Sequence, residues 1–219
     1  MPTGYRKASD MPQVIPIFPL DGAVLLPGGQ LPLNIFEPRY LNMLDDAMAG
    51  DRIIGMVQTR PGGETTRPVL AAIGCAGRVT SFAETPDGRY VITLTGICRF
   101  EVKDELPVRS PYRQVRADFS AFEGDLAVGQ HDLPEAEREE FLTALRHYLD
   151  HRGLDIDWSA AESAPTAALV NSLAMALPFE AAEKQALLET PTILDRCAAL
   201  VALLEIDAAD SDDAPPSMQ

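Results

Sequence analysis

Residues that cross-link a small protein are scarce in this sequence. Only three cysteines occur among 219 residues, at Cys75, Cys98 and Cys197, and an odd number of distant cysteines argues against a disulfide framework. No Cys-x-x-Cys pair is present, so the commonest structural zinc motif is absent. A chain of this length buries about 70% of its unfolded surface on folding and needs neither disulfides nor a structural metal for stability. We expect three buried thiols, no metal and a reducing compartment, the cytoplasm.

Long apolar runs are missing as well. The longest, residues 197–204, is far shorter than the roughly 20 residues that cross a bilayer. The basic residues Arg6 and Lys7 are not followed by the apolar core of a signal peptide. We therefore expect no membrane partner.

Positive charge is scarce in the C-terminal part. Residues 1–122 contain 13 basic and 13 acidic side chains, whereas residues 123–219 contain 5 basic and 20 acidic ones. The formal net charge of −15 therefore resides in the second segment. Because so acidic a chain repels phosphate backbones, we expect no nucleic-acid partner.

Motifs of nucleotide binding and hydrolysis are absent too. None of the three lysines lies in a G-x-x-x-x-G-K-[ST] motif, which binds phosphates. The G-x-S-x-G motif of serine hydrolases is also absent. Lys184, in AAEKQALL, is expected on an exposed helix face rather than beside a serine nucleophile. His147 and His151 have the spacing of a metal pair but lack the glutamate of H-E-x-x-H. We expect no catalytic residue, no metal and no cofactor.

The first part of the chain, residues 13–122, is rich in β-propensive runs. Within residues 74–102, Pro86-Asp87-Gly88 separates two such runs and predicts a hairpin turn. The alternation over residues 90–95 is typical of a strand with one buried face, and Gly96 predicts a bulge. Further strands are expected over 14–20, over 22–36 as two runs around Pro27-Gly28-Gly29, and over 52–58 and 112–122.

From about residue 133 the apolar period becomes helical, and four helices are expected in a compact bundle over residues 123–207. Helix starts are marked by Pro134, Pro165 and Thr190-Pro191. The predicted apolar stripes are Phe141, Leu142, Leu145, Tyr148 and Leu149; Leu169, Val170, Leu173 and Leu177; and Ile193, Cys197, Leu200, Val201 and Leu204, with residues 179–189 as a further helix. Residues 1–12 and the acidic tail 208–219 are predicted to be disordered.

A helix embedded in the β-rich part is predicted within PLNIFEPRYLNML, residues 32–44. Pro38 suits the first helical position, because it lacks an N–H that would have no partner there. Gly50 suits the C-terminal end. The side chains expected to face the sheet are Leu41, Leu44 and Met48.

The start of this helix carries the clearest candidate site. Glu37 suits the positive end of the helix dipole, and Arg39 is placed to reach back to a carboxylate or to strand-end carbonyls. We interpret Glu37, Arg39 and Tyr40 as a structural corner, and the alternative is a ligand contact at the mouth of a barrel. Arg78, Arg89 and Arg99 on the hairpin are read as a salt-bridged surface, with contact to an anion or peptide carboxylate as the alternative. The candidate substrate-binding residues are Phe36, Glu37, Arg39, Tyr40, Arg78 and Arg99.

These motifs, taken in order, resemble the N-terminal substrate-binding domain of the Lon protease family. The resemblance covers residues 14–119, and LVNSLAMALPFEAAEKQALLE (169–189) is similar to the helical region of that family. The positions that carry it are Pro19-Leu20, Pro27-Gly28, Pro32-Leu33, Ile35 to Tyr40, Gly74, Gly88-Arg89, Gly96, Arg99 and Phe100. The resemblance implies an α+β fold, in which a PUA-like β pseudo-barrel is followed by a helical bundle.

The resemblance also implies a role in holding exposed polypeptide. Lon proteases append an ATPase and a Ser–Lys protease module, and this chain is expected to end before either. Our hypothesis is a non-enzymatic module that binds unfolded or extended polypeptide through an apolar groove, at the barrel or between barrel and bundle, as an adaptor in protein quality control with a protease complex. The alternative is a small-molecule-binding protein or enzyme with a pocket near Glu37, Arg39 and Tyr40. RNA binding, by analogy with PUA-like barrels, is disfavoured by the charge.

Overall fold

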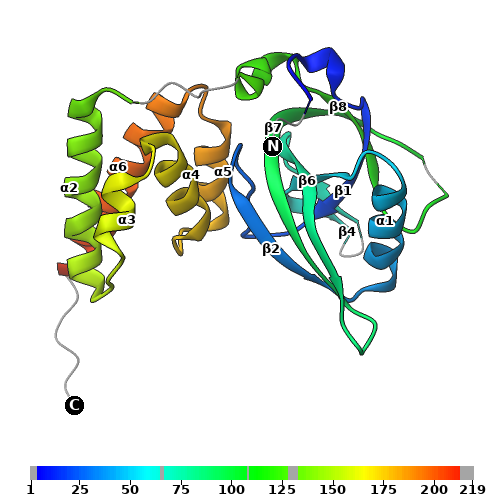
Figure 1. Cartoon of the computed structure of the whole chain (residues 1–219), viewed down its shortest axis with the longest axis horizontal. Coiled ribbons are helices and arrows are strands. Elements are labelled where there is room, and N and C mark those ends of the chain that lie inside the picture. Colours follow the sequence, from blue (N-terminus) through cyan, green and yellow to red (C-terminus); the bar gives the residue numbers. More distant parts are fainter. Residues whose placement is uncertain (1–3, 65–66, 108, 128–132, 213–219) are drawn as a thin grey trace. The chain divides into compact units, whose positions relative to one another are not determined.

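The computed structural model divides into two compact units, whose elements are labelled in Figure 1. Unit 1 contains residues 1–130 and 175–189, and unit 2 contains residues 131–174 and 190–219. The first break, between residues 130 and 131, lies in the range 120–133 where the change to the helical part is expected, whereas the segment 175–189 belongs to unit 1 and not to the predicted bundle. The structure describes residues 4–64, 67–107, 109–127 and 133–212, with side chains as far as residue 209.

Unit 1 is built on a mixed sheet that closes on itself. Its strands are β1 (Val14–Pro19), β2 (Gln30–Ile35), β3 (Ile53–Val57), β6 (Ile73–Glu84), β7 (Tyr90–Glu105) and β8 (Gln114–Asp118). The order is β2-β7-β6-β3-β1-β8, and β7 pairs also with β8, which completes a ring (Figure 1). Only β1 and β3 are parallel among these pairs. A β barrel was expected from the sequence, and its PUA-like character stays a prediction.

A small second sheet pairs β4 (Thr59–Glu64) with β5 (Arg67–Leu70). The sequence did not predict this hairpin. Proline and glycine at positions 61–63 have low β propensity, and the register shifts between Arg60 and Gly63. Of the run 22–36, only β2 is a strand, while Val24, Leu25 and Leu26 are buried without strand pairing.

The predicted hairpin and its bulge are both confirmed. Gly88 has a φ of +78° in the turn between β6 and β7. Ala76 pairs with Cys98 and Gly77 pairs with Gly96, which leaves Ile97 as the extra residue on β7. The bulge bends β7, so that its first part pairs with β2 and its last part with β8.

Gly96 lies directly under the chain that precedes β2. Its N–H donates to the Gly29 carbonyl at 2.9 Å, and its carbonyl accepts from the Gly28 N–H at 2.9 Å. A Cβ atom at position 96 would lie 2.1 Å from the Leu26 carbonyl oxygen. The absence of a side chain is therefore required for this close backbone approach.

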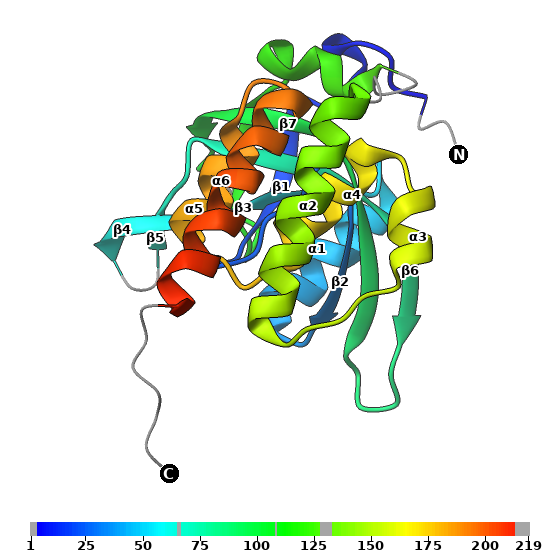
Figure 2. The same cartoon turned by 90° about the vertical axis from the view of Figure 1, so that its left-hand side faces the viewer.

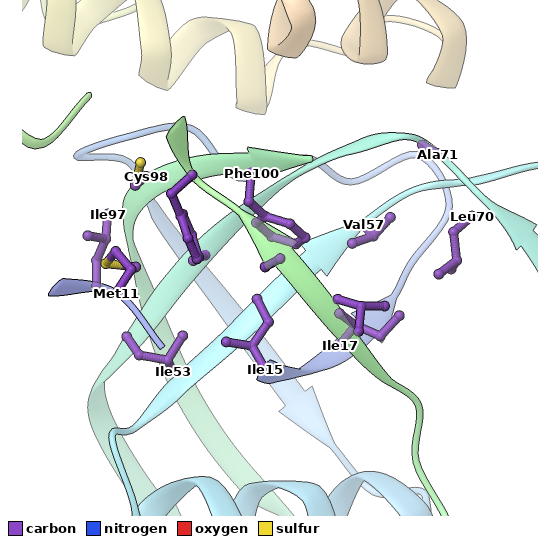
Figure 3. Close-up of a cluster of buried hydrophobic side chains, with 14 of the residues drawn as sticks. Met11, Ile15, Ile17, Ile53, Val57, Leu70, Ala71, Ile97, Cys98 and Phe100 are labelled. Atoms are coloured by element: carbon purple, nitrogen blue, oxygen red, sulfur yellow. The ribbon is translucent and has the colours of Figure 1, made fainter. Parts of the chain in front are cut away.

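The barrel interior is filled by aliphatic and aromatic side chains, most of them from β1, β3, β6, β7 and β8 (Figure 3). Phe100 and Ile17 are fully buried, and Met11, which precedes β1, is 3% exposed. Within residues 4–12 the structure differs from the predicted disorder of residues 1–12, because Ala8–Asp10 form a 3₁₀ turn and Met11 joins the core, while residues 1–3 lie outside the described residues. The rest of the cluster comprises Ile15, Ile53, Val57, Leu70, Ala71, Ala76, Ile97, Cys98, Val115, Ala117, Phe119 and Leu126.

Helix α1 (Pro38–Ala49) begins and ends where the sequence predicts, with Gly50 as its C-terminal cap. Its buried face is rotated from the predicted stripe. Leu44 is buried as expected, but the other buried residues are Tyr40, Met43 and Ala47, while Leu41 and Met48 are half-buried.

Unit 2 contains α2 (Glu135–Arg152), α3 (Trp158–Ser163), most of α4 (Thr166–Ala176) and α6 (Ile193–Asp212). Helices α2 and α6 lie side by side (Figure 2). The sequence missed α3 and assigned the helix over 179–189 to this bundle instead. The starts of α2 and α4 are confirmed, but α6 begins later than predicted, because Thr192 rather than Thr190 accepts a hydrogen bond from the Asp195 N–H at 3.1 Å.

The end of α6 also differs from the prediction of a disordered tail over residues 208–219. The helix continues to Asp212, and Ala208 is 1% exposed. Residues 213–219 lie outside the described residues. No helix in the described part of the chain is long and apolar enough to cross a bilayer.

The close approach at Gly96 generates a prediction. Gly96→Ala should lower the free energy of unfolding by about 2–3 kcal/mol, because the new methyl group overlaps the Leu26 carbonyl. Gly124→Ala is the matched control, since a Cβ there meets nothing within 4 Å, and it should change stability by less than about 0.5 kcal/mol. Urea denaturation followed by circular dichroism measures both variants. Equal stability of the two would contradict the proposed constraint.

Candidate functional site

A groove in unit 1 lies between the β3–β4 junction and helix α5 (Ala181–Glu189). Its volume is about 730 Å³, within the range of ligand-binding clefts. Four alanines contribute to its wall, and polar residues occur mainly at its ends. The lining residues are Asp21, Gln58, Thr59, Arg60, Pro61, Ala71, Ala181, Ala182, Gln185, Ala186 and Glu189.

Gln58 connects the strand side of the groove to α5 and is only 2% exposed. Its Nε2 donates to the Ala181 carbonyl at 2.9 Å and to Gln185 Oε1 at 3.2 Å. Its Oε1 accepts from the Gly22 N–H at 3.1 Å. Both amide protons and the carbonyl are engaged, so the side chain is held in one orientation.

Gln185 continues the same hydrogen-bond network to the barrel. Its Nε2 donates to the Ile73 carbonyl of β6 at 3.1 Å and to Glu189 Oε1 at 2.7 Å. Two glutamine side chains therefore join α5 to the sheet. A fully satisfied amide network of this kind fixes the width of the groove.

The helical wall is lined by small side chains. Ala182 and Ala186 are four residues apart, so they lie on one face of α5 and leave a hollow beside Gln185. Arg60, at the strand side, donates from Nε to the Leu70 carbonyl at 3.2 Å. The groove thus offers an apolar floor with charged residues of both signs at its rim.

Arg99 fixes the other end of α5. Its guanidinium makes two parallel hydrogen bonds to the Asp125 carboxylate, both at 2.9 Å, and its Nη1 donates to the Leu188 carbonyl at 3.1 Å. It also lies over the Phe122 ring, 4.5 Å from the centroid. The residue is 3% exposed. This bidentate, buried arrangement makes Arg99 a structural anchor, and its role as a substrate contact stays a prediction.

The other hairpin arginines do not gather around Arg99. Arg89 lies at the hairpin turn and pairs with Asp87 at 2.9 Å, where both side chains are more than half exposed. Arg78 lies opposite Ile53 and Thr95 in the sheet. The structure therefore does not bring the predicted arginine group together.

The corner at the start of α1 holds the predicted pair. Arg39 Nη2 lies 2.8 Å from Glu37 Oε2, and its guanidinium lies 4.6 Å from the Tyr40 ring centroid. The Arg39 and Glu37 side chains are 47% and 42% exposed. An ion pair this exposed contributes at most about 1 kcal/mol.

Tyr40 is the buried member of this corner. Its ring contacts Phe18 edge-on with centroids 4.3 Å apart, and burial raises the pKa of its hydroxyl. Phe36, by contrast, is 62% exposed. Of the four corner residues, Tyr40 joins the core, and Phe36, Glu37 and Arg39 face solvent.

Lys184 and the histidine pair His147 and His151 were also considered as functional residues in the sequence. Lys184 is buried, not exposed as predicted; its Nζ donates to the Met175 carbonyl at 3.2 Å, and burial lowers its pKa. His147 and His151 do come together, with their Nε2 atoms 3.1 Å apart. No group of three or more metal-ligating side chains occurs within the described residues.

The sequence did not single out Gln58, Gln185 or the α5 alanines. A weak signal was available, since Gln58 is a polar residue directly after the fully buried strand β3. The alanines of α5 read as ordinary helix formers. Their role depends on which face of α5 meets the barrel.

The chain matches a known protein family over most of its length. Residues 14–205 match the model of the family described as the ATP-dependent protease La (LON) substrate-binding domain. The Lon protease of Roseiflexus castenholzii is 27% identical over 207 residues, which are 93% of this chain and 25% of that protein. Lon protease 2 of Myxococcus xanthus is 33% identical over 119 residues, 53% of this chain and 14% of that protein. The chain thus spans a quarter or less of these curated relatives.

Two solved structures share the fold. A Lon N-terminal domain protein from Xanthomonas campestris is 23% identical with a TM-score of 0.63, and the match covers 86% of this chain and 97% of that one. The N-terminal domain of the Mycobacterium avium complex Lon protease is 15% identical with a TM-score of 0.62, covering 90% and 98%. At these identities the likeness concerns the fold.

The anchoring role of Arg99 is testable by stability. Arg99→Ala should lower the free energy of unfolding by about 3–5 kcal/mol, because it leaves the Asp125 carboxylate buried without its partner. Arg89→Ala, which breaks the exposed pair with Asp87, should cost less than about 1 kcal/mol. Urea denaturation measures the difference, and similar small losses in both variants would refute the anchor.

Two residues of the α1 corner, Tyr40 and Arg39, should differ in their contribution to stability. Tyr40→Ala should lower the free energy of unfolding by about 3–5 kcal/mol, because it removes a buried ring that packs on Phe18. Arg39→Ala should remain within about 1 kcal/mol of the wild type. Thermal unfolding of the two variants is the measurement. A loss in Arg39→Ala as large as that in Tyr40→Ala would show that the ion pair holds the fold.

Proposed function

Since the chain belongs to the family of ATP-dependent protease La (LON) substrate-binding domains, we propose that it is a non-enzymatic module that binds unfolded or extended polypeptide segments. It serves as an adaptor in protein quality control and presents bound segments to a protease complex. The proposal includes a cytoplasmic location, which agrees with a sequence of only three cysteines, all of them buried.

The groove of unit 1 is the observation that carries this proposal. Its floor of alanines accepts aliphatic side chains of varied shape, because nothing in it demands one particular hydrogen-bonding group. The Gln58–Gln185 network keeps the groove open without a ligand. A preformed apolar groove with a polar rim suits clients that share exposed hydrophobic residues but no sequence.

The number of client side chains buried in the groove sets the affinity. Burying one leucine-sized side chain stabilises a complex by about 1.5–3 kcal/mol, and association costs at least about 4 kcal/mol of lost freedom. Several buried side chains are therefore required before a segment binds in the micromolar range. Such moderate affinity suits an adaptor, which must also release its client.

A different observation favours the small-molecule alternative. A hollow of about 620 Å³ beside the Glu37–Arg39 corner is lined by four arginines and two glutamates: Arg39, Arg67, Arg109, Arg113, Glu64 and Glu105. Arg67 and Arg113 both pair with Glu105, at 2.8 and 2.7 Å, which also lowers the pKa of that carboxyl. An anionic small molecule is the ligand class that such a hollow favours.

Filling the groove tests the leading proposal. Ala186→Trp should weaken binding of a fluorescently labelled, casein-type unfolded protein by at least about tenfold, because the indole occupies the space of one client side chain. Ala83→Trp, on an exposed position of β6, is the matched control and should leave binding unchanged. Fluorescence anisotropy gives both affinities.

Two results would contradict the proposal. One is equal and negligible affinity for the unfolded client and for a folded control protein. The other is loss of client binding in Arg39→Ala while Ala186→Trp binds normally, because that outcome moves the site to the arginine-lined hollow.

A further inference from the structure

Unit 2 carries a second groove, formed by α2 and α6, with a volume of about 270 Å³. Its α6 residues recur at helical i, i+3, i+4 and i+7 spacing and so form one face of that helix. Two glutamates one turn apart on α2 form the opposite wall. The lining residues are Glu137, Glu140, Leu194, Cys197, Ala198, Val201, Ala202 and Glu205.

The floor of this groove is apolar and hollow. Ala198 and Ala202 are exposed, and their methyl groups leave space between larger neighbours. Leu194, at one end, is 43% exposed, whereas Cys197 and Val201 are buried beneath the floor. A leucine exposed beside two exposed alanines is a surface that a partner's aliphatic side chains can cover.

The rim is acidic and has no counter-charge. Glu137, Glu140 and Glu205 form no ion pair with any described residue. Glu137 Oε2 is buried without a hydrogen-bond partner. Burial, with smaller contributions from Glu140 and Glu137, raises the pKa of Cys197 to about 11. The groove therefore combines an apolar floor with uncompensated negative charge.

We propose that this groove docks a basic amphipathic helix of a partner protein. The aliphatic side chains of that helix cover Ala198 and Ala202, and its lysines or arginines pair with Glu137, Glu140 and Glu205. This surface is separate from the unit 1 groove, so its binding does not depend on the function proposed above.

Geometry and charge both select this class of partner. The face from Leu194 to Glu205 is about 16 Å long, which matches three turns of a helix. An acidic segment is repelled by the rim, and a neutral apolar one leaves three carboxylates partly desolvated without a cation. Cationic side chains that flank the apolar stripe satisfy both requirements.

The test uses the full chain and a fluorescein-labelled peptide of about 14 residues, or four helical turns. The peptide contains leucine, lysine and alanine, with leucines spaced i, i+3, i+4 and i+7. A second peptide of the same composition has its leucines spread evenly around the helix. We expect the amphipathic peptide to bind at least about tenfold more tightly, and its affinity to fall with added salt.

Matched variants locate the site. The triple variant Glu137→Gln, Glu140→Gln, Glu205→Gln should weaken binding by about tenfold. The control, Glu135→Gln, Glu139→Gln, Asp150→Asn, removes the same charge from exposed positions outside the groove and should change it less than about threefold. Ala198→Leu, which fills the floor without changing charge, should also weaken binding by about tenfold.

Three outcomes would overturn the proposal. Equal losses in the two triple variants would show diffuse attraction to an acidic protein. Equal affinity for the two peptides would show that the apolar stripe is not recognised. Unchanged binding in Ala198→Leu would place the peptide elsewhere.

Discussion

The buried guanidinium of Arg99 is the interaction on which the arrangement of unit 1 depends. It comes from β7, pairs with Asp125 in the 3₁₀ segment Ser120–Leu126, and donates to the last turn of α5 through the Leu188 carbonyl. One side chain thus joins three segments that are far apart in the sequence. Because a charge at 3% exposure must keep its partners, these three segments are held in one arrangement. The wall of the groove is a consequence of that constraint.

The barrel supplies the second constraint. Strand β7 pairs with β2, β6 and β8. The bulge at Ile97 lies between its β2-paired and β8-paired parts, and the neighbouring Gly96 admits the Leu26 carbonyl. With the ring closed, β3 ends beside α5, and Gln58 is placed to bond Ala181. The groove therefore results from backbone geometry in the sheet and from two amides that maintain its width.

The two grooves differ in the charge of their rims. In unit 1 the floor is apolar and the rim carries both signs of charge, with Arg60 and Glu189 at its edge. In unit 2 the rim is wholly acidic, with Glu137, Glu140 and Glu205 around exposed alanines. The excess of 20 acidic over 5 basic residues after residue 122 is thus not only a solvating feature, because part of it surrounds an apolar surface. The two proposals therefore assign a tolerant surface to unit 1 and a charge-selective surface to unit 2.

The sequence by itself determined the local structure: the hairpin at Pro86-Asp87-Gly88, the bulge after Gly96, the start of α1 at Pro38 and the starts of α2 and α4. Each of these follows from residues adjacent in the chain, whose backbone preferences are intrinsic. Only the tertiary structure decided which faces are buried. Packing of Tyr40 on Phe18 rotates α1 from its predicted stripe, burial of Lys184 accompanies docking of α5, and Arg99 becomes an anchor because Asp125 folds back to it. The groove belongs to this second class, because Gln58 and Ala181 are brought together by long-range docking that no local pattern encodes.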